Sequence, residues 1–246
     1  MRTEIIAILA VLLAGAGIGA AQSNSQFVKA NQEYAAGDFN AAVSDYEELV
    51  RSREDTPNLF YNLGNAYFRK KDFGRAILNY ERTLALDSHH PEAQANLRIA
   101  RDEARALELI PSRLGRILEL ATPNQYATAA AIAFWIFAFC LAALILNRRR
   151  RGGAIALSIL SLIIFGTSAF AAWTLEQGRH GPGLAIVTVE TADARIATAD
   201  SANRVLALPS GSEIKVVSQR GDWVYAELPN NLRGWIPAKS AEKVRF

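Results

Sequence analysis

The chain reads Tyr34-x2-Gly37-Asp38-Phe39-x2-Ala42-x3-Tyr46 and, 34 positions later, Phe68-x2-Lys71-Asp72-Phe73-x2-Ala76-x3-Tyr80. Two copies of one pattern, residues 23–56 and 57–90, therefore follow each other in tandem. In the second copy, Phe60, Leu63, Gly64 and Tyr67 lie at i, i+3, i+4 and i+7, which places them on one stripe of a helix. This spacing predicts an array of stacked helices that share an apolar core.

Small residues and prolines mark the expected helices of each copy. Gly64 and Ala76 leave room where two helices approach closely, and Pro57 and Pro91 stand where a missing N–H has no effect on a helix start. The pattern resembles the tetratricopeptide repeat, a helix pair of about 34 residues. The second copy departs from that consensus only at Thr83 and Ser88, and the first copy has Ala30 in place of the glycine. Residues 91–109 repeat the first helix of the pair and are expected to cap the array.

Tetratricopeptide arrays bind protein partners on a concave face lined by the first helix of each copy. By register, the residues expected on that face are Phe27, Asn31, Tyr34, Tyr61, Asn62, Asn65, Phe68 and Arg69. A carboxamide can donate to and accept from an extended peptide backbone, and an arginine can pair with a carboxylate. The sequence predicts that Asn65→Ala with Arg69→Ala abolishes partner capture without unfolding the repeats. The competing interpretation is a set of exposed polar residues without a ligand.

Three segments are apolar enough to enter a membrane. Residues 1–21 end in small residues, which predicts a signal peptide cleaved after Ala21, with an uncleaved anchor as the alternative. Residues 127–146 and 154–174 contain no charged residue, and each is about 30 Å long as a helix. Because neither stretch has a polar face, they are predicted to be two transmembrane helices rather than buried helices of a soluble domain.

The loop at residues 147–153 carries Arg148, Arg149, Arg150 and Arg151. Four arginines between two spans predict a cytoplasmic loop, so the repeats and the C-terminal segment are expected on the periplasmic side of a bacterial inner membrane. Without these arginines, Lys and Arg fall from 27 to 23 against 24 acidic residues. The basic character of the chain is therefore mostly a topology signal, and nucleic-acid binding is not inferred.

Residues 110–126 join the repeats to the first predicted span. A short apolar stripe beside Arg113 and Arg116 predicts either a helix on the outer membrane surface or a helix packed against the repeat array. The sequence leaves these two alternatives open.

The C-terminal segment, residues 184–246, changes to short β-branched runs bounded by turn residues, which predicts a small all-β barrel. Three marks resemble the bacterial SH3-like domain: Leu208-Pro209-Ser210-Gly211, Gly221-Asp222-Trp223 and Gly234-Trp235-Ile236. The resemblance implies an aromatic groove formed by Trp223, Tyr225 and Trp235, with peptidoglycan as the candidate ligand. The alternative is that the tryptophans only support the fold.

The chemistry of an enzyme is missing from the sequence. No nucleophile, base and orienting group converge in a recognisable motif, and His89, His90 and His180 have no partner at metal-ligand spacing. Cys140 is the single cysteine, so an intrachain disulfide or Cys-based metal site is excluded. The sequence predicts a multi-domain interaction protein without catalytic residues, cofactors or metals.

The order of the parts resembles the BatE-type proteins of the Bacteroides aerotolerance operon. The resemblance implies an envelope complex with von Willebrand A-domain membrane proteins and a MoxR-type ATPase, linked to oxidative-stress tolerance or assembly. A second hypothesis is a cell-wall sensor or anchor that binds peptidoglycan through the C-terminal domain and recruits a wall enzyme through the repeats. Because two and a half repeats are few for a stable array, a partner or a second copy of the chain is expected to complete the stack.

Overall fold

The computed structural model of the chain describes residues 25–53, 55–110, 113–118, 120–146, 151–177 and 183–245. The predicted signal segment and Arg148–Arg150 lie outside these residues. The chain forms two compact units, one made of the residues up to Glu108 together with those from Ala185 onward, and the other of Leu109–Leu184. The first unit is therefore discontinuous, with a helical part before the second unit and a β-sheet part after it.

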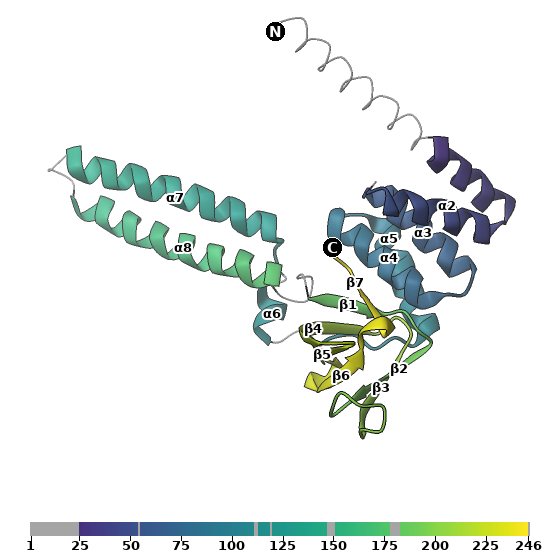
Figure 1. Cartoon of the computed structure of the whole chain (residues 1–246). Coiled ribbons are helices and arrows are strands. Elements are labelled where there is room, and N and C mark those ends of the chain that lie inside the picture. The colour runs from purple at the N-terminus through teal and green to yellow at the C-terminus, as the bar shows by residue number, and fades with distance from the viewer. Residues whose placement is uncertain are drawn as a thin grey trace, which may run out of the picture. The chain divides into compact units, whose positions relative to one another are not determined.

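The helical part of the first unit follows the 34-residue period of the sequence (Figure 1). The helix at residues 25–36 and α2 (Phe39–Arg51) form the first pair, and α3 (Pro57–Arg69) and α4 (Phe73–Leu86) form the second. The helix α5 (Pro91–Ala104) follows as an unpaired first helix. The expected helical repeat array is thus confirmed.

Helix starts are capped in the same way in both copies. Asp38 caps α2 and Asp72 caps α4, each accepting the N–H of the residue three positions on. Thr56 and His90 cap α3 and α5 in the same manner. These acceptors satisfy N–H groups that the first turn of a helix leaves unpaired, so His90 has a structural role at a helix start.

The turn after each first helix contains a left-handed residue at the same repeat position. These residues are Gly37, Lys71 and Arg105, with φ of +85°, +63° and +49°. In each turn, the following N–H donates to the carbonyl oxygen five residues earlier, which is the closure expected of a helix C-terminus. The turn therefore persists in the second copy although a lysine replaces the glycine, and α5 ends as the other first helices do.

The core of the array contains the residues that the repeat pattern places there. Tyr46, Tyr80 and Phe60 are almost completely buried. Gly64 lies against the Tyr80 ring, where an added Cβ would come within 2.8 Å of two ring carbons. Glycine at this position lets α3 and α4 approach more closely than a larger residue would permit.

The β-sheet part contains seven strands in the order β3-β2-β6-β5-β4-β1-β7. Their bounds are β1 (Leu184–Val187), β2 (Thr191–Arg195), β3 (Arg204–Pro209), β4 (Glu213–Arg220), β5 (Trp223–Glu227), β6 (Arg233–Pro237) and β7 (Ala241–Lys243). The sequence predicts a small all-β, SH3-like barrel. The all-β fold is confirmed, but the barrel is not, because the sheet is open, with β3 and β7 at its edges. The reason lies in strand pairing, because closure would require these two edge strands to hydrogen-bond to each other.

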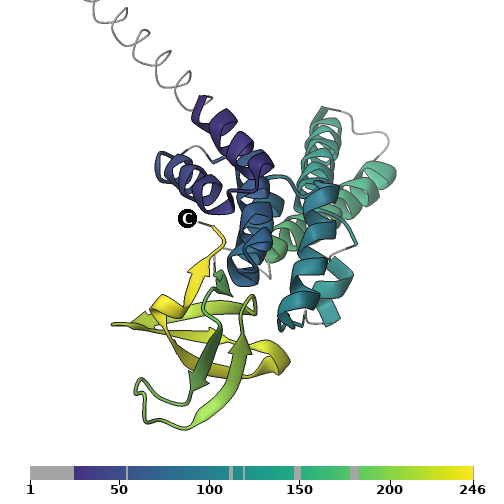
Figure 2. The same ribbon diagram turned by 90° about the vertical axis from the view of Figure 1, so that its right-hand side faces the viewer.

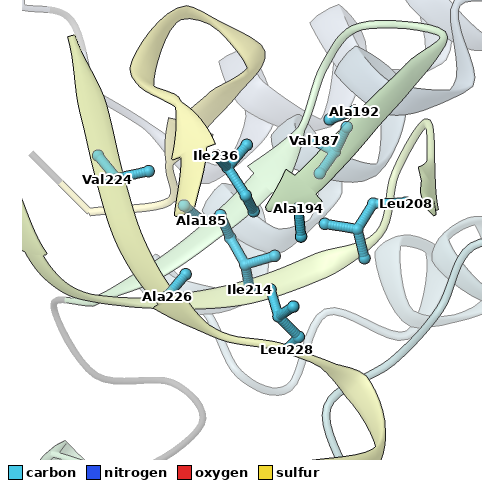
Figure 3. Close-up of a cluster of buried hydrophobic side chains, with 10 residues drawn as sticks. All are labelled: Ala185, Val187, Ala192, Ala194, Leu208, Ile214, Val224, Ala226, Leu228 and Ile236. Atoms are coloured by element: carbon cyan, nitrogen blue, oxygen red, sulfur yellow. The ribbon is translucent and has the colours of Figure 1, made fainter. Parts of the chain in front are cut away.

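One face of the sheet carries an apolar core, drawn in Figure 3. Its buried members include Leu208, Ile214, Leu228 and Ile236, each at 1% exposure or less. Leu107, which follows α5, also packs against this core. The helical part of the chain thus contributes a side chain to the core of the sheet.

The second unit contains α6 (Arg113–Leu118), α7 (Pro123–Leu146) and α8 (Arg151–Gln177). The helices α7 and α8 lie side by side along their length (Figure 1 and Figure 2). Their most apolar windows have mean hydropathies of 2.6 and 2.1, and both helices are long enough to cross a membrane.

Large apolar side chains are exposed on the surface of the α7–α8 pair, and some of its small residues are buried. Ala133 and Ser161 are each 3% exposed, whereas Trp135 and Phe139 are 59% and 69% exposed. Small residues at a helix contact with large apolar side chains outside are typical of helices that pack within a membrane.

Candidate functional site

The residues predicted to bind a partner lie on two successive first helices of the array. Phe27, Asn31 and Tyr34 lie on the helix at residues 25–36, and the other five lie on α3. All are partly exposed except Arg69, which is exposed. The remaining residues of this set are Tyr61, Asn62, Asn65 and Phe68.

A hydrogen-bond ladder of asparagines connects the first helices. Asn31 Oδ1 accepts from Tyr46 Oη at 2.6 Å and from Asn62 Nδ2 at 2.9 Å. One repeat later, Asn65 Oδ1 accepts from Tyr80 Oη at 2.8 Å and from Asn96 Nδ2 at 2.9 Å. The carbonyl oxygens of Asn31 and Asn65 therefore serve the array itself.

The amide nitrogens of Asn31 and Asn65, the two asparagines whose oxygens accept in the ladder and which are called the groove asparagines below, have a different role. Asn62 and Asn96 donate through Nδ2, and this fixes the Asn31 and Asn65 amides with Oδ1 toward the ladder. Among the described residues, neither Asn31 Nδ2 nor Asn65 Nδ2 has a hydrogen-bond acceptor. Each nitrogen carries N–H groups, so the face offers two donors that are one repeat apart.

The ladder ends in apolar residues at both ends of the array. Val28 stands where Asn62 stands in the next copy, and Ile99 stands where Asn65 stands in the preceding one. Val28 is 46% exposed and Ile99 is 51% exposed. The asparagine pattern of the ladder is thus not continued beyond these two positions, and Ile99 adds an exposed apolar side chain to α5.

Aromatic contacts repeat with the same period. Phe27 lies 6.0 Å from Tyr46 and Tyr61 lies 6.3 Å from Tyr80, measured between ring centroids. The rings of Tyr34 and Phe68 each meet the phenylalanine five positions later, edge to face, with centroids 5.4 Å apart. Edge-to-face pairs hold aromatic side chains in place, so this face is preorganised.

Arg69 links the two copies at the edge of this face. Its Cζ lies 4.4 Å from the centroid of the Phe39 ring, which is a cation–π contact. Among the residues that the structure describes, Arg69 forms no ion pair. Its positive charge therefore remains available to a carboxylate.

The tyrosines of the ladder are hydroxyl donors in the neutral form. Burial raises the pKa of Tyr46 to about 12. Burial likewise raises the pKa of Tyr80 well above its ordinary value. Both hydroxyl groups therefore keep their protons at neutral pH and remain able to donate.

The three predicted groove residues of the sheet domain lie on one face. Trp223 and Tyr225 alternate with core residues on β5, and Tyr225 pairs with Trp235 of β6. The ring centroids of Tyr225 and Trp235 are 5.1 Å apart, and Arg220 Cζ lies 5.7 Å from the Trp235 ring. All three aromatic residues are partly exposed, so this aromatic face is open to a ligand.

Sequence reasoning missed one charged cluster, centred on Arg101 of α5. Its guanidinium contacts the carboxylates of Glu81, Glu108 and Glu213. Since Glu213 lies 112 positions from Arg101, periodicity could not reveal this contact. The one available signal is Gly74, which stands where the first copy has Asn40. A glycine at this position leaves room for Ser210 and Val187, which lie close to α4.

Metal binding has no candidate site in the part of the chain that the structure describes. There, no group of three or more His, Cys, Asp or Glu residues is placed to hold an ion.

Comparison with known proteins supports the interpretation of the array. A profile of the tetratricopeptide repeat family matches residues 27–91, which cover both copies except the first four residues of the first. No curated protein matches the chain. Tetratricopeptide repeats are interaction modules that bind proteins, and the comparisons indicate no enzyme family.

Proposed function

We propose that this protein is a membrane-anchored scaffold whose repeats bind an extended peptide segment of a protein partner. The observation that carries the proposal is the direction of the asparagine amides. Asn31 and Asn65 use their oxygens inside the array and present their N–H groups on the face. Two such donors, one repeat apart, suit the carbonyl oxygens of an extended backbone.

The rest of the face suggests the chemistry of that segment. Tyr61 and Phe68 flank Asn65 and offer aromatic surface for apolar side chains of the partner. Arg69, the last residue of α3, adds an exposed positive charge. This charge favours a partner segment that places a carboxylate beside the C-terminal end of α3. The segment we propose is therefore extended, partly apolar and acidic at one end.

The α7–α8 pair is the proposed membrane anchor. Residues on both sides of this pair belong to one folded unit, so the chain must cross the membrane an even number of times. Both soluble parts then lie on one side, and the arginine loop lies on the other. The positive-inside rule makes the loop cytoplasmic, with the repeats and the sheet domain in the periplasm.

The short helix α6 is proposed to lie at the membrane surface. Its Leu114 and Ile117 are 50% and 61% exposed. Exposed apolar side chains directly before a transmembrane helix suit the boundary between head groups and acyl chains.

The finer biological role rests on the order of the parts alone. That order suggests a BatE-type envelope complex with von Willebrand A-domain proteins and a MoxR-type ATPase. A second candidate role is binding of peptidoglycan, which the open aromatic face of Trp223, Tyr225 and Trp235 favours, because aromatic rings stack on sugars. Retention of the full-length protein on purified wall material, lost in Trp235→Ala, would support that second role.

The proposed groove is tested with Asn31→Asp and Asn65→Asp combined. Aspartate keeps the oxygen that accepts from the tyrosine and the neighbouring asparagine, but it has no N–H to offer. Alanine is a weaker test because it leaves the buried Tyr80 hydroxyl without its acceptor, which costs about 1–3 kcal/mol. The matched control is Gln32→Glu with Asn40→Asp, which adds the same charge at exposed positions.

Partners are captured with the full-length protein from its native membranes in mild detergent. We expect the combined Asn31→Asp and Asn65→Asp substitutions to abolish capture, while the control retains it and the melting temperature of the repeats is preserved. Equal capture by the folded double variant and by the control would reject this face as the binding site.

A further inference from the structure

The two chain segments that flank the membrane helices meet at one buried residue. Leu107 N–H donates to Ser212 Oγ at 3.1 Å, and Val187 N–H donates to the Ser212 carbonyl oxygen at 3.0 Å. Glu213 N–H in turn donates to the Leu107 carbonyl oxygen at 2.9 Å. Ser212 is 0% exposed, so these bonds lie inside the first unit.

Two glycines permit a close approach between the array and the sheet domain. A Cβ added to Gly74 of α4 would lie 2.3 Å from Ser210 Oγ and 2.8 Å from the Val187 carbonyl oxygen. A Cβ added to Gly211 would lie 2.2 Å from Ile77 Cδ1. The first copy has an exposed asparagine, Asn40, at the position of Gly74, so only the second copy is adapted to this contact.

Buried charges join the same surfaces. Arg101 Nη2 contacts Glu81 of α4 and Glu213 of β4, and its Nη1 lies 3.2 Å from Glu108. The Glu81 and Glu213 side chains are only 4% and 1% exposed. A buried carboxylate that loses its partner is strongly destabilising, so Arg101 ties together three segments of the unit.

Apart from these contacts, the helix α5 packs mainly against α4. It has no second helix of its own repeat, and its buried residues are only Ala93, Leu97 and Ala100. A helix of this length is marginal in water without tertiary packing. Yet α5 carries Asn96, which completes the ladder at Asn65, five residues before Arg101.

We propose that the sheet domain is an internal partner that holds α5 against the repeats, with Arg101 as the positioning residue. The sheet domain takes the place of the missing second helix of the third repeat. Insofar as the face formed by the first helices binds a partner, which rests on the proposed function, α5 at the end of that face is in place only while the sheet domain is docked.

The test is amide hydrogen exchange on the full-length protein in detergent micelles. Glu213→Gln keeps the shape of the side chain and removes the charge that faces Arg101. We expect exchange in α5 to become about tenfold faster, while exchange in α2 changes little, because opening would be local. The matched control is Glu103→Gln, an exposed residue of α5 outside the cluster. Unchanged exchange in α5, or an equal rise in α2 and α5, would overturn the proposal.

A second variant covers the case in which Glu213→Gln prevents folding. Glu108 is 46% exposed and pairs with the other terminal nitrogen of Arg101, so Glu108→Gln weakens the same cluster without burying an unpaired group. We expect exchange in α5 to become faster, by a smaller factor than in Glu213→Gln. An exchange rate in α5 equal to that of the wild type would overturn the proposal.

Partner capture with the same variants separates this proposal from the proposed function. Reduced capture together with faster α5 exchange supports both. Faster α5 exchange with full capture overturns the dependence of the groove on docking and leaves the scaffold role intact. If the Asn31 and Asn65 substitutions do not affect capture, the groove assignment fails, while the exchange result still decides whether the sheet domain holds α5.

Discussion

Asn96 of α5 donates a 2.9 Å hydrogen bond to Asn65 of α3. The same bond joins Asn62 to Asn31 one repeat earlier. These bonds give the groove asparagines a structural role through their oxygens and leave their N–H groups for a ligand. In the proposed function, stability and binding use different atoms of the same side chain, so they can be separated by substitution.

Replacement of Lys71 by glycine is expected to stabilise the array. Lys71 has φ of +63°, a conformation that is unfavourable for a residue with a Cβ and free for glycine. We expect Lys71→Gly to raise the free energy of unfolding by about 0.5–1 kcal/mol, measured by denaturant titration in detergent. Lys70 has φ of −77°, so Lys70→Gly is the control and should not stabilise. Equal effects of both changes would contradict this explanation.

Replacement of Gly74 by alanine is expected to weaken the contact between the array and the sheet domain. The added Cβ would lie within 2.3 Å of Ser210 Oγ, and such overpacking costs about 1–3 kcal/mol. The control is Asn40→Ala at the equivalent, exposed position of the first copy, where a change within about 0.5 kcal/mol is expected. Equal thermal stability of the two variants would show that Gly74 and Ser210 do not approach each other closely.

Alkaline pH is expected to destabilise the array through its buried tyrosines. Burial raises the pKa of Tyr46 to about 12, whereas in the unfolded chain a tyrosine has a pKa of about 10. Above pH 10 the unfolded state releases this proton first, so stability that is fully present below pH 10 is lost as the pH rises toward 12.

The measurement is the free energy of unfolding at a series of pH values for the wild type and for Tyr46→Phe. The phenylalanine variant should lose less stability between pH 10 and 12 than the wild type does. Identical pH dependence of the two proteins would mean that Tyr46 does not contribute to alkaline unfolding.

Removal of the loop arginines is expected to disturb the orientation of the chain. Substituting Arg148–Arg151 by glutamine removes the charges that keep the loop in the cytoplasm. Cys140→Ser removes the single natural cysteine, and Ser201→Cys places one on the sheet domain. A membrane-impermeant maleimide should then label the sheet domain in spheroplasts. The glutamine substitutions should reduce that labelling. Arg51→Gln with Arg53→Gln is the control. Labelling that does not depend on the loop arginines would contradict the proposed topology.

The repeat array could be predicted because its contacts recur with the period of the sequence. Gly64 packs against Tyr80, and the turn at Gly37 recurs at Lys71, as a local pattern requires. Register also places the eight predicted residues on the first helices, where the structure has them. The direction of the Asn65 amide could not be predicted, because register shows which face a side chain is on but not which of its atoms are already paired.

The sheet domain and its docking were harder to predict from the sequence. Strand positions follow from composition, but barrel closure depends on whether β3 and β7 pair, and in the structure they are the edges of an open sheet. The contact of Arg101 with Glu213 joins residues that are 112 positions apart. Such a contact has no local or periodic signal, since it depends on how the whole chain returns to the array.

Partner binding by the face of the first helices is tested most directly by placing a photoreactive amino acid on that face, in the full-length protein in its native membrane. Tyr61 is the position of choice because it lies one turn before Asn65 on α3. Among the described residues, its hydroxyl accepts a single, long hydrogen bond, 3.4 Å, from Asn96. Asn40 on α2 is the exposed control position. We predict that the Tyr61 position crosslinks to a distinct protein, that the crosslink disappears with Asn31→Asp and Asn65→Asp, and that Asn40 gives none. The same crosslinked protein from both positions, or none from Tyr61, would contradict the claim that this face binds a partner.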